Sequence, residues 1–211
     1  MDKITTPRER LRKIINDAYE IFCQQVVGGA IQIENEASMQ LHLSNILLQL
    51  GRLNVFSPKE FFNIVLEKKI ELIHETGKSK NKKARVDIWV EYKNSDSLIS
   101  AAAIELKFLK KSANAAVTDG RHSVYKDLEN LEEYAISVAN PELYLCEIVA
   151  STNSNFIENK GEKFSIGNDT IIQSYTQKDS TYCNIKISKQ YDPIKWDEYG
   201  DYSFLKIHPK D

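Results

Sequence analysis

One predominantly apolar stretch, residues 98–109, constrains the fold of this chain more than any other segment. It contains the run Ala101-Ala102-Ala103-Ile104, which lacks the alternation of polar and apolar residues found in a strand with one face in water. A strand without this alternation is typical of the centre of a sheet that is covered on both faces. The segment therefore predicts a central strand with other elements packed on each side of it.

The segments around this strand predict the rest of a sheet. Residues 86–90 alternate between the two faces of a second strand, and the Asn-Ser-Asp-Ser sequence at 94–97 predicts a turn between the two. Residues 70–75 predict an earlier strand, which the polar, basic loop 76–83 would join to the second. Residues 143–150 predict a fourth strand. The last sixty residues are less clear, although Ile185 and Ile187 indicate one strand there.

Helical spacing of apolar residues predicts four helices, at residues 8–27, 35–50, 58–68 and 120–139. Several starts and stops carry the expected cap residues, which are Thr5 or Thr6 with Pro7, Gly28-Gly29, Gly51 and Ser57-Pro58. The coarse order is helices, three strands as a meander, a helix and a strand. This order predicts an α/β layer arrangement in which helices flank a mixed central sheet.

Length and composition set wider limits. With 211 residues, the chain has the size of one domain with a sizeable core. No run of about 18 apolar residues is present, and the N-terminus lacks the pattern of a signal peptide, so we expect no membrane association and a cytoplasmic location. The three cysteines are far apart, which argues against a zinc site built on thiolates. The net charge of −2 neither requires nor excludes a nucleic-acid partner.

Charged residues inside two of the apolar strands carry the chemistry. Asp87 interrupts the second strand, while Glu105 and Lys107 lie two residues apart on the third. Because side chains alternate along a strand, Glu105 and Lys107 share one face and Leu106 faces the other way. A symmetric hairpin register about the turn pairs Asp87 with a residue near 104. The sequence therefore predicts that Asp87 lies beside Glu105.

Two converging carboxylates favour a hard divalent cation. Mg²⁺ binds oxygen ligands, so we expect Asp87 and Glu105 to hold Mg²⁺, with Mn²⁺ as a substitute and the carbonyl of Leu106 as a further ligand. Such a cation can hold a scissile phosphate and activate a water molecule. In this interpretation, Lys107 orients the attacking water or stabilises the charge of the transition state.

The pattern Val86-Asp87 followed by Glu105-Leu106-Lys107 resembles the PD-(D/E)XK nuclease superfamily, which includes many restriction endonucleases. Val86 replaces the proline of the motif. The order of helix, three strands, helix and strand also resembles that family's core. The resemblance covers roughly residues 30–150 of a single domain, leaving 151–211 as a C-terminal elaboration. It implies a restriction-endonuclease-like fold.

The resemblance also implies a metal-dependent endonuclease that cleaves DNA, for example in restriction or phage defence. Many members act as homodimers, so a homodimer is one expectation here. Members often add a glutamate from the preceding helix to the metal site, and Glu36 fits that role best, with Glu34 as its rival. A polar residue from the following helix is also common, and Tyr125 or Lys126 lies in the corresponding segment.

Basic residues near the motif are candidates for binding the nucleic-acid backbone. They precede Asp87 or follow the Glu-Leu-Lys strand, and they are Lys78, Lys80, Lys82, Lys83, Arg85, Lys110, Arg121 and Lys126. The simpler interpretation is a solvated loop. For the motif itself, the simpler interpretation is a cross-strand ion pair between Asp87 and Lys107. Glu36 alternatively complements a helix dipole.

Two further hypotheses compete with the nuclease. One is a catalytically silent module that keeps the fold and binds nucleic acid or protein. The other is a small α/β interaction protein in which the motif occurs by chance. A structure in which Asp87 and Glu105 point apart would favour the last of these.

Overall fold

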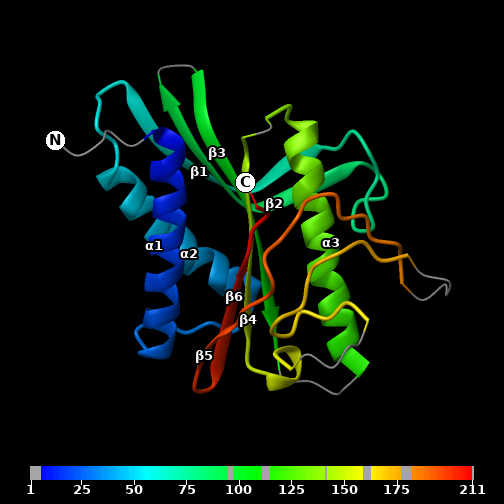
Figure 1. The fold of residues 1–211 in the computed structure, drawn as a ribbon. Helices are drawn as coiled ribbons and strands as arrows, with labels where there is room; N and C mark the ends of the chain where they lie inside the picture. The colour runs from blue at the N-terminus through cyan, green and yellow to red at the C-terminus, as the bar shows by residue number, and fades with distance from the viewer. Residues whose placement is uncertain are drawn as a thin grey trace.

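The computed structural model describes residues 6–94, 97–110, 115–140, 142–158, 163–176 and 182–210. Its layers are shown in Figure 1. Helices α1 (Pro7–Val27) and α2 (Glu36–Leu53) cover one face of a sheet, and helix α3 (Ala115–Ser137) covers the other. The expected α/β class, with helices on both faces of a mixed sheet, is therefore present. Within these residues, no helix is both long and apolar enough to cross a bilayer.

The sheet has six strands in the order β1-β2-β3-β4-β6-β5. They are β1 (Glu60–Glu71), β2 (Lys83–Asn94), β3 (Ser97–Leu109), β4 (Tyr144–Ser151), β5 (Asp197–Tyr199) and β6 (Tyr202–Ile207). The pairs β1–β2 and β2–β3 are antiparallel, whereas β4 is parallel to β3 and follows it through α3. The meander, the crossover helix and the fourth strand were predicted, but the first strand ends at Glu71 and does not extend over 72–75 as expected. Residues 95–96 of the expected turn lie outside the described residues.

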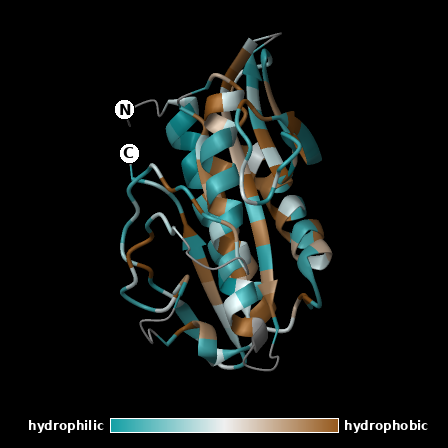
Figure 2. Ribbon diagram, turned by 90° about the vertical axis from the view of Figure 1, so that its right-hand side faces the viewer, coloured by the Kyte–Doolittle hydropathy of each residue, from teal (hydrophilic) through white to brown (hydrophobic). Residues whose placement is uncertain are grey.

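The central position of β3 is confirmed by its burial. Residues 101–104 are all fully buried, and they alternate between two separate hydrophobic clusters. Ala102 and Ile104 pack toward α1 and α2, while Ala101 and Ala103 pack toward α3. Figure 2 shows hydrophobic residues along the central strands. The small alanine side chains allow helices to approach both faces of this strand.

The first two helices begin as predicted, and α1 ends before Gly28 as expected, but α2 continues beyond residue 50 to Leu53. Thr6 caps α1 in a capping box with Glu9, and Pro7 occupies the first turn. Gly51, expected to end the second helix, lies inside α2 instead. A Cβ atom built on Gly51 would lie 2.1 Å from the ring of Phe62 on β1. This glycine is therefore required for close packing between helix and strand rather than for a helix end.

The predicted helix at residues 58–68 was wrong, because this segment forms most of β1. Ser57 and Pro58 form a turn, in which the N–H of Glu60 donates to the carbonyl of Ser57, and do not start a helix. Residues 60–71 then pair along β2. Local cap signals were overridden here by pairing with the neighbouring strand, which buries the alternate side chains Phe62 and Ile64.

The C-terminal segment, expected as an elaboration of the domain, adds two strands to the sheet. β6 pairs antiparallel with β4, and β5 forms the edge beside it. The strand expected at Ile185 and Ile187 is only a single bridge between Tyr175 and Ile185. The rest of the segment packs over α3, where Phe164 and Trp196 join the hydrophobic cluster on that face.

Candidate active site

The site forms where β2 and β3 separate. Their pairing ends at Ile88 and Ile104, one residue before Asp87 and Glu105. Beyond this point, the Asp87 carboxylate accepts the backbone N–H of Leu106 at 2.8 Å, so it bridges the gap that the ladder leaves. The expected proximity of Asp87 and Glu105 is therefore present in the structure.

Helix α2 holds the backbone at the same point. The side-chain amide of Gln40 donates to the carbonyl of Asp87 at 2.7 Å and to the carboxylate of Glu67 at 3.1 Å. Glu67 has a positive φ of 53° and interrupts β1 beside Asp87. Gln40 was not identified in the sequence, and it acts here as a positioning contact for Asp87.

Strand parity places the charged residues of β3 as expected. The side chain of Leu106 packs in the cluster beneath α1 and α2, so Leu106 can contribute to the site only through its backbone. Glu105 and Lys107 face the opposite way, toward α3. There they meet Asp127, a buried residue of α3. Asp127 lies directly after Lys126 and is the helix residue that reaches the site.

Lys107 joins α2 and α3 across the site. Its Nζ lies 2.9 Å from a carboxylate oxygen of Asp127 and 3.2 Å from Oε1 of Glu36. Glu36 lies in the first turn of α2 and is 48% exposed, so it forms the rim of the site. Its rival Glu34 precedes the helix and contributes its backbone N–H to Ser38. The structure therefore brings Glu36, Glu105 and Lys107 together with Asp87.

A second lysine, Lys78, enters from the loop between β1 and β2. Its Nζ lies 3.2 Å from Oε2 of Glu105 and 2.5 Å from Oδ1 of Asp127. From the sequence, Lys78 belongs to the basic residues expected to bind a nucleic-acid backbone. The structure instead places its ammonium group among the carboxylates.

Tyr134 fixes the other oxygen of Glu105. The Tyr134 hydroxyl donates to Oε1 of Glu105 at 2.7 Å and lies near Asn130 on the same helix. Asp127, Asn130 and Tyr134 follow helical spacing, so α3 presents one polar edge to the site. That edge runs beside the apolar stripe of α3, and polar residues recurring along a buried helix face were the signal that could have identified it.

Glu147 on β4 adds a further buried carboxyl group. It pairs with Glu105 in the parallel register of β3 and β4, and its side chain is fully buried. Neither carboxylate oxygen accepts a hydrogen bond from any residue that the structure describes. The sequence showed Glu147 only as one member of an alternating strand, so its proximity to the site required the parallel pairing.

Burial and charge set the protonation of these groups. Burial raises the pKa of Asp87 to about 6, and it raises the pKa of Glu105 and Glu147 well above the ordinary range. Burial alone would lower the pKa of Lys78 and Lys107, but the neighbouring carboxylates outweigh it and raise both. Burial therefore favours the protonated, neutral forms of Glu105 and Glu147, whereas both lysines keep their positive charge beside Asp127.

The donor set has the chemistry of a hard-cation site. Asp87, Glu105 and Asp127 supply carboxylate oxygens, and the unbonded oxygens of Glu147 lie behind them. Among the described residues, no three His, Cys, Asp or Glu side chains converge closely enough to hold a metal ion. In this structure, the ammonium groups of Lys78 and Lys107 lie between the carboxylates instead. These carboxylates are nevertheless ligands of the type that a divalent cation binds.

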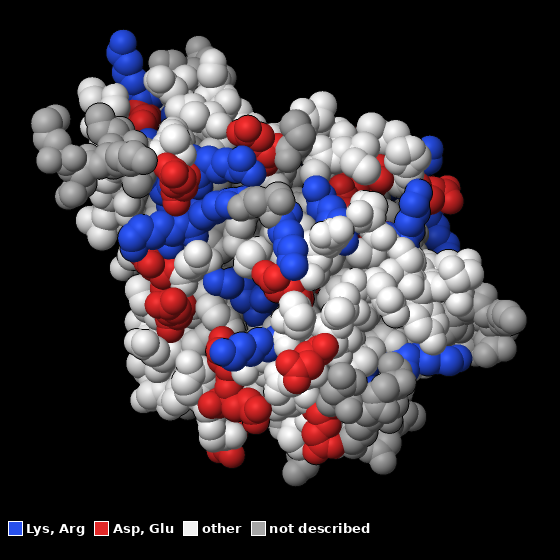
Figure 3. Space-filling model, viewed as in Figure 1, with Lys and Arg blue, Asp and Glu red and all other residues white. Residues whose placement is uncertain are grey.

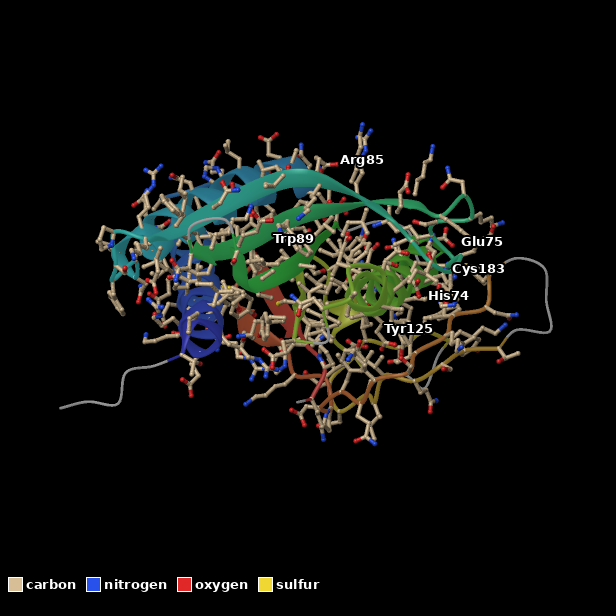
Figure 4. The ribbon with its side chains drawn as sticks, turned by 90° about the horizontal axis from the view of Figure 1, so that it is seen from above. His74, Glu75, Arg85, Trp89, Tyr125 and Cys183 are labelled. Carbon is tan, nitrogen blue, oxygen red and sulfur yellow. The ribbon has the colours of Figure 1, made fainter. Side chains whose placement is uncertain are left out.

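The residues expected to bind nucleic acid divide into several groups. Lys83 and Arg85 lie exposed on β2 and pair with Glu71 and Lys69 on β1, and together these residues line a hollow of about 420 Å³. Arg85 is on the outer side of this hairpin in Figure 4. Four further lysines of the predicted nucleic-acid contacts are exposed or partly exposed: Lys80 and Lys82 in the loop, Lys110 after β3 and Lys126 on α3.

Arg121 was a wrong assignment. Its side chain is buried, and its Nη2 donates to the backbone carbonyl of Asn155 at 2.7 Å. Arg121 therefore anchors the short 3₁₀ turn Ser154–Phe156 to α3 and is not available to a backbone phosphate. Tyr125 also lies away from the carboxylates, because its hydroxyl donates to the carbonyl of Ser165 within the C-terminal core.

Charge on the remaining surface is mixed. Basic and acidic side chains are interspersed on the face shown in Figure 3.

Comparisons of the chain with protein-family models, with curated proteins and with solved structures find no match.

Proposed function

We propose that this protein is a metal-dependent nuclease with a restriction-endonuclease-like core. The observation that carries the proposal is the convergence of Asp87, Glu105 and Lys107 where the central hairpin opens, with Glu36 at the rim. Their order along the chain is that of the PD-(D/E)XK motif. A chance motif on an exposed sheet would leave these side chains in solvent, whereas Glu105 is fully buried and Lys107 is 14% exposed.

Each residue has a role in this proposal. Asp87 and Glu105 would hold Mg²⁺ or Mn²⁺, with Glu36 and the Leu106 backbone completing the ligand set. When bound, such a cation polarises a phosphodiester group and lowers the pKa of a bound water. Lys107 orients the attacking water or stabilises charge on the phosphate. Gln40 and Tyr134 hold Asp87 and Glu105 in position, as outer contacts of a metal site usually do.

The substrate we propose is DNA. The hollow between Lys69, Lys83 and Arg85 lies on the strand that continues into Asp87, so a phosphate backbone bound there would lead toward the site. Lys80, Lys82, Lys110 and Lys126 would add less specific contacts. One chain carries one such site, and a homodimer would supply the second site needed to cut both strands of a duplex.

One observation favours a different class of function. Lys78 and Lys107 already neutralise the carboxylates, and the described residues contain no three-ligand metal cluster. A catalytically silent module that binds nucleic acid without a metal would have this property. The two proposals differ in whether a divalent cation binds in a way that depends on Asp87 and Glu105.

Cleavage of plasmid and of single-stranded and duplex oligonucleotides, with Mg²⁺ or Mn²⁺, tests the nuclease. We expect the wild type to cut and Asp87→Asn and Lys107→Met to lose cutting while remaining folded. Lys13→Met is a matched control, because Lys13 is an exposed lysine on α1. Retained cutting in both site variants would refute the assignment. Absence of cutting on every substrate, together with absence of cation binding that depends on Asp87 and Glu105, would favour the silent module.

A further inference from the structure

Lys78 differs from Lys107 in how far its side chain is exposed. Both ammonium groups contact Asp127, while Lys78 also contacts the fully buried Glu105 and Lys107 also contacts Glu36 on α2. The Lys78 side chain is 37% exposed, compared with 14% for Lys107. Lys78 therefore lies more open to solvent than Lys107, which spans from Glu36 of α2 to Asp127 of α3.

The backbone around Lys78 is fixed to α3. The N–H of Gly77 donates to Glu129 at 2.6 Å, and the N–H of Ser79 donates to Thr76, whose hydroxyl bonds to Asn130. These contacts flank Lys78 on both sides. Movement of the Lys78 ammonium group therefore requires only rotation of its side chain, and the loop remains in place.

A buried carboxylate beside Lys78 requires a positive charge. Asp127 is 1% exposed and its two oxygens contact Lys78 and Lys107, while the fully buried Glu105 also lies against Lys78. Buried carboxylates without a counter-charge strongly destabilise a fold. An ammonium group and a divalent cation can each supply the missing charge, and the contacts of Lys78 with Glu105 would be lost if a cation took its place.

We infer that Lys78 is a tethered counter-cation, which neutralises the carboxylates when no divalent cation is bound and rotates outward when one binds. The inference rests on the proposed function, because it concerns the same cation site. It gives Lys78, which lies outside the Asp87, Glu105 and Lys107 motif, the role of a counter-charge to the site. It also accounts for a carboxylate cluster with the right donors and no open three-ligand arrangement. Occupancy by Lys78 makes cation binding weaker and keeps the cation-free protein folded.

Cation binding to the full chain tests this inference. Mn²⁺ affinity is measured by electron paramagnetic resonance for the wild type, Lys78→Met and the control Lys13→Met, in which the replaced lysine is exposed on α1. Loss of the competing Lys78 ammonium group should strengthen Mn²⁺ binding by Lys78→Met about tenfold or more, and Lys13→Met should match the wild type. Without divalent cations, Lys78→Met should melt at a lower temperature, and Mg²⁺ should restore the loss.

A second measurement uses the wild type and does not depend on a variant that folds. The side-chain ammonium signal of Lys78, observed by NMR with ¹⁵N-labelled lysine, should change from that of a hydrogen-bonded group to that of a solvated group as Mg²⁺ is added. The Lys107 signal should remain that of an enclosed group. An unchanged Lys78 signal at saturating Mg²⁺ would overturn the inference.

The outcomes separate this inference from the proposed function. Mn²⁺ binding that is lost in Asp87→Asn, but equal in the wild type and Lys78→Met, would overturn the role of Lys78 and leave the nuclease proposal standing. Absence of Mn²⁺ binding in the wild type and in Lys78→Met would overturn both. Tighter binding by Lys78→Met, together with the NMR change, supports the inference.

Discussion

Replacing Asp87 with asparagine should stabilise the protein in the absence of divalent cations. The ordinary pKa of 3.8 for this carboxyl group rises to about 6 in the folded chain, chiefly through burial. The folded state therefore holds the Asp87 proton more tightly than the unfolded state does. By linkage, stability associated with this group is present at low pH and is lost as the pH rises from about 4 to about 6.

The size of the effect follows from the two pKa values. One pKa unit corresponds to about 1.4 kcal/mol, so the difference between 3.8 and about 6 corresponds to a cost of up to about 3 kcal/mol at pH 7. Asparagine carries no charge, and its side-chain oxygen can still accept the N–H of Leu106. Asp87→Asn should therefore avoid most of this cost without losing the bridge between β2 and β3.

Urea unfolding at pH 4 and pH 7, with a chelator present, measures this difference. We expect Asp87→Asn to be more stable than the wild type at pH 7 by as much as about 3 kcal/mol and nearly equal at pH 4. Asp17→Asn is the control, because Asp17 is a half-exposed partner of Lys13 and should change stability by less than about 0.5 kcal/mol. A variant no more stable than the wild type at pH 7 would refute the burial argument.

Three other predictions address packing, positioning and substrate binding. Gly51→Ala should lower the free energy of unfolding by about 1–3 kcal/mol in urea titrations, because its Cβ would overlap the Phe62 ring; an unchanged midpoint would contradict that packing. Tyr134→Phe should weaken Mn²⁺ affinity by about tenfold to a hundredfold, since Glu105 loses its hydroxyl donor, and equal affinity would remove Tyr134 from the site. Arg85→Ala should weaken DNA binding and reduce its salt dependence by about one counterion, as measured by fluorescence anisotropy; an unchanged salt slope would place the DNA elsewhere.

The local patterns of the sequence were informative where one strand or helix determines the outcome. The alanine run of β3 indicated a strand buried on both faces, and Thr6 with Pro7 indicated the start of α1. Strand parity placed Glu105 and Lys107 on one face, and the short hairpin brought Asp87 beside Glu105. These features depend on neighbours within a few residues, or on one tight turn, so the sequence alone can specify them.

Features that depend on distant segments were missed. Residues 58–68 begin with a helix-start signal, but most of them form a strand because they pair with β2, which is distant in the sequence. The strands β5 and β6 were not predicted, because β6 forms by pairing with the edge of β4 and β5 by pairing with β6. From the sequence, Gly51 indicates a helix end, whereas in the structure its missing side chain leaves room for the Phe62 ring.

The division between sequence and tertiary structure is clearest at the site. Residue periodicity indicates the α/β class, the hairpin and the shared face of Glu105 and Lys107 beside Asp87. Packing between distant elements brings Asp127 from α3, Glu147 from β4 and Lys78 from a loop to those residues. Their grouping depends on helix packing and parallel pairing between segments far apart in the chain, and burial among them then decides the charge that each group carries.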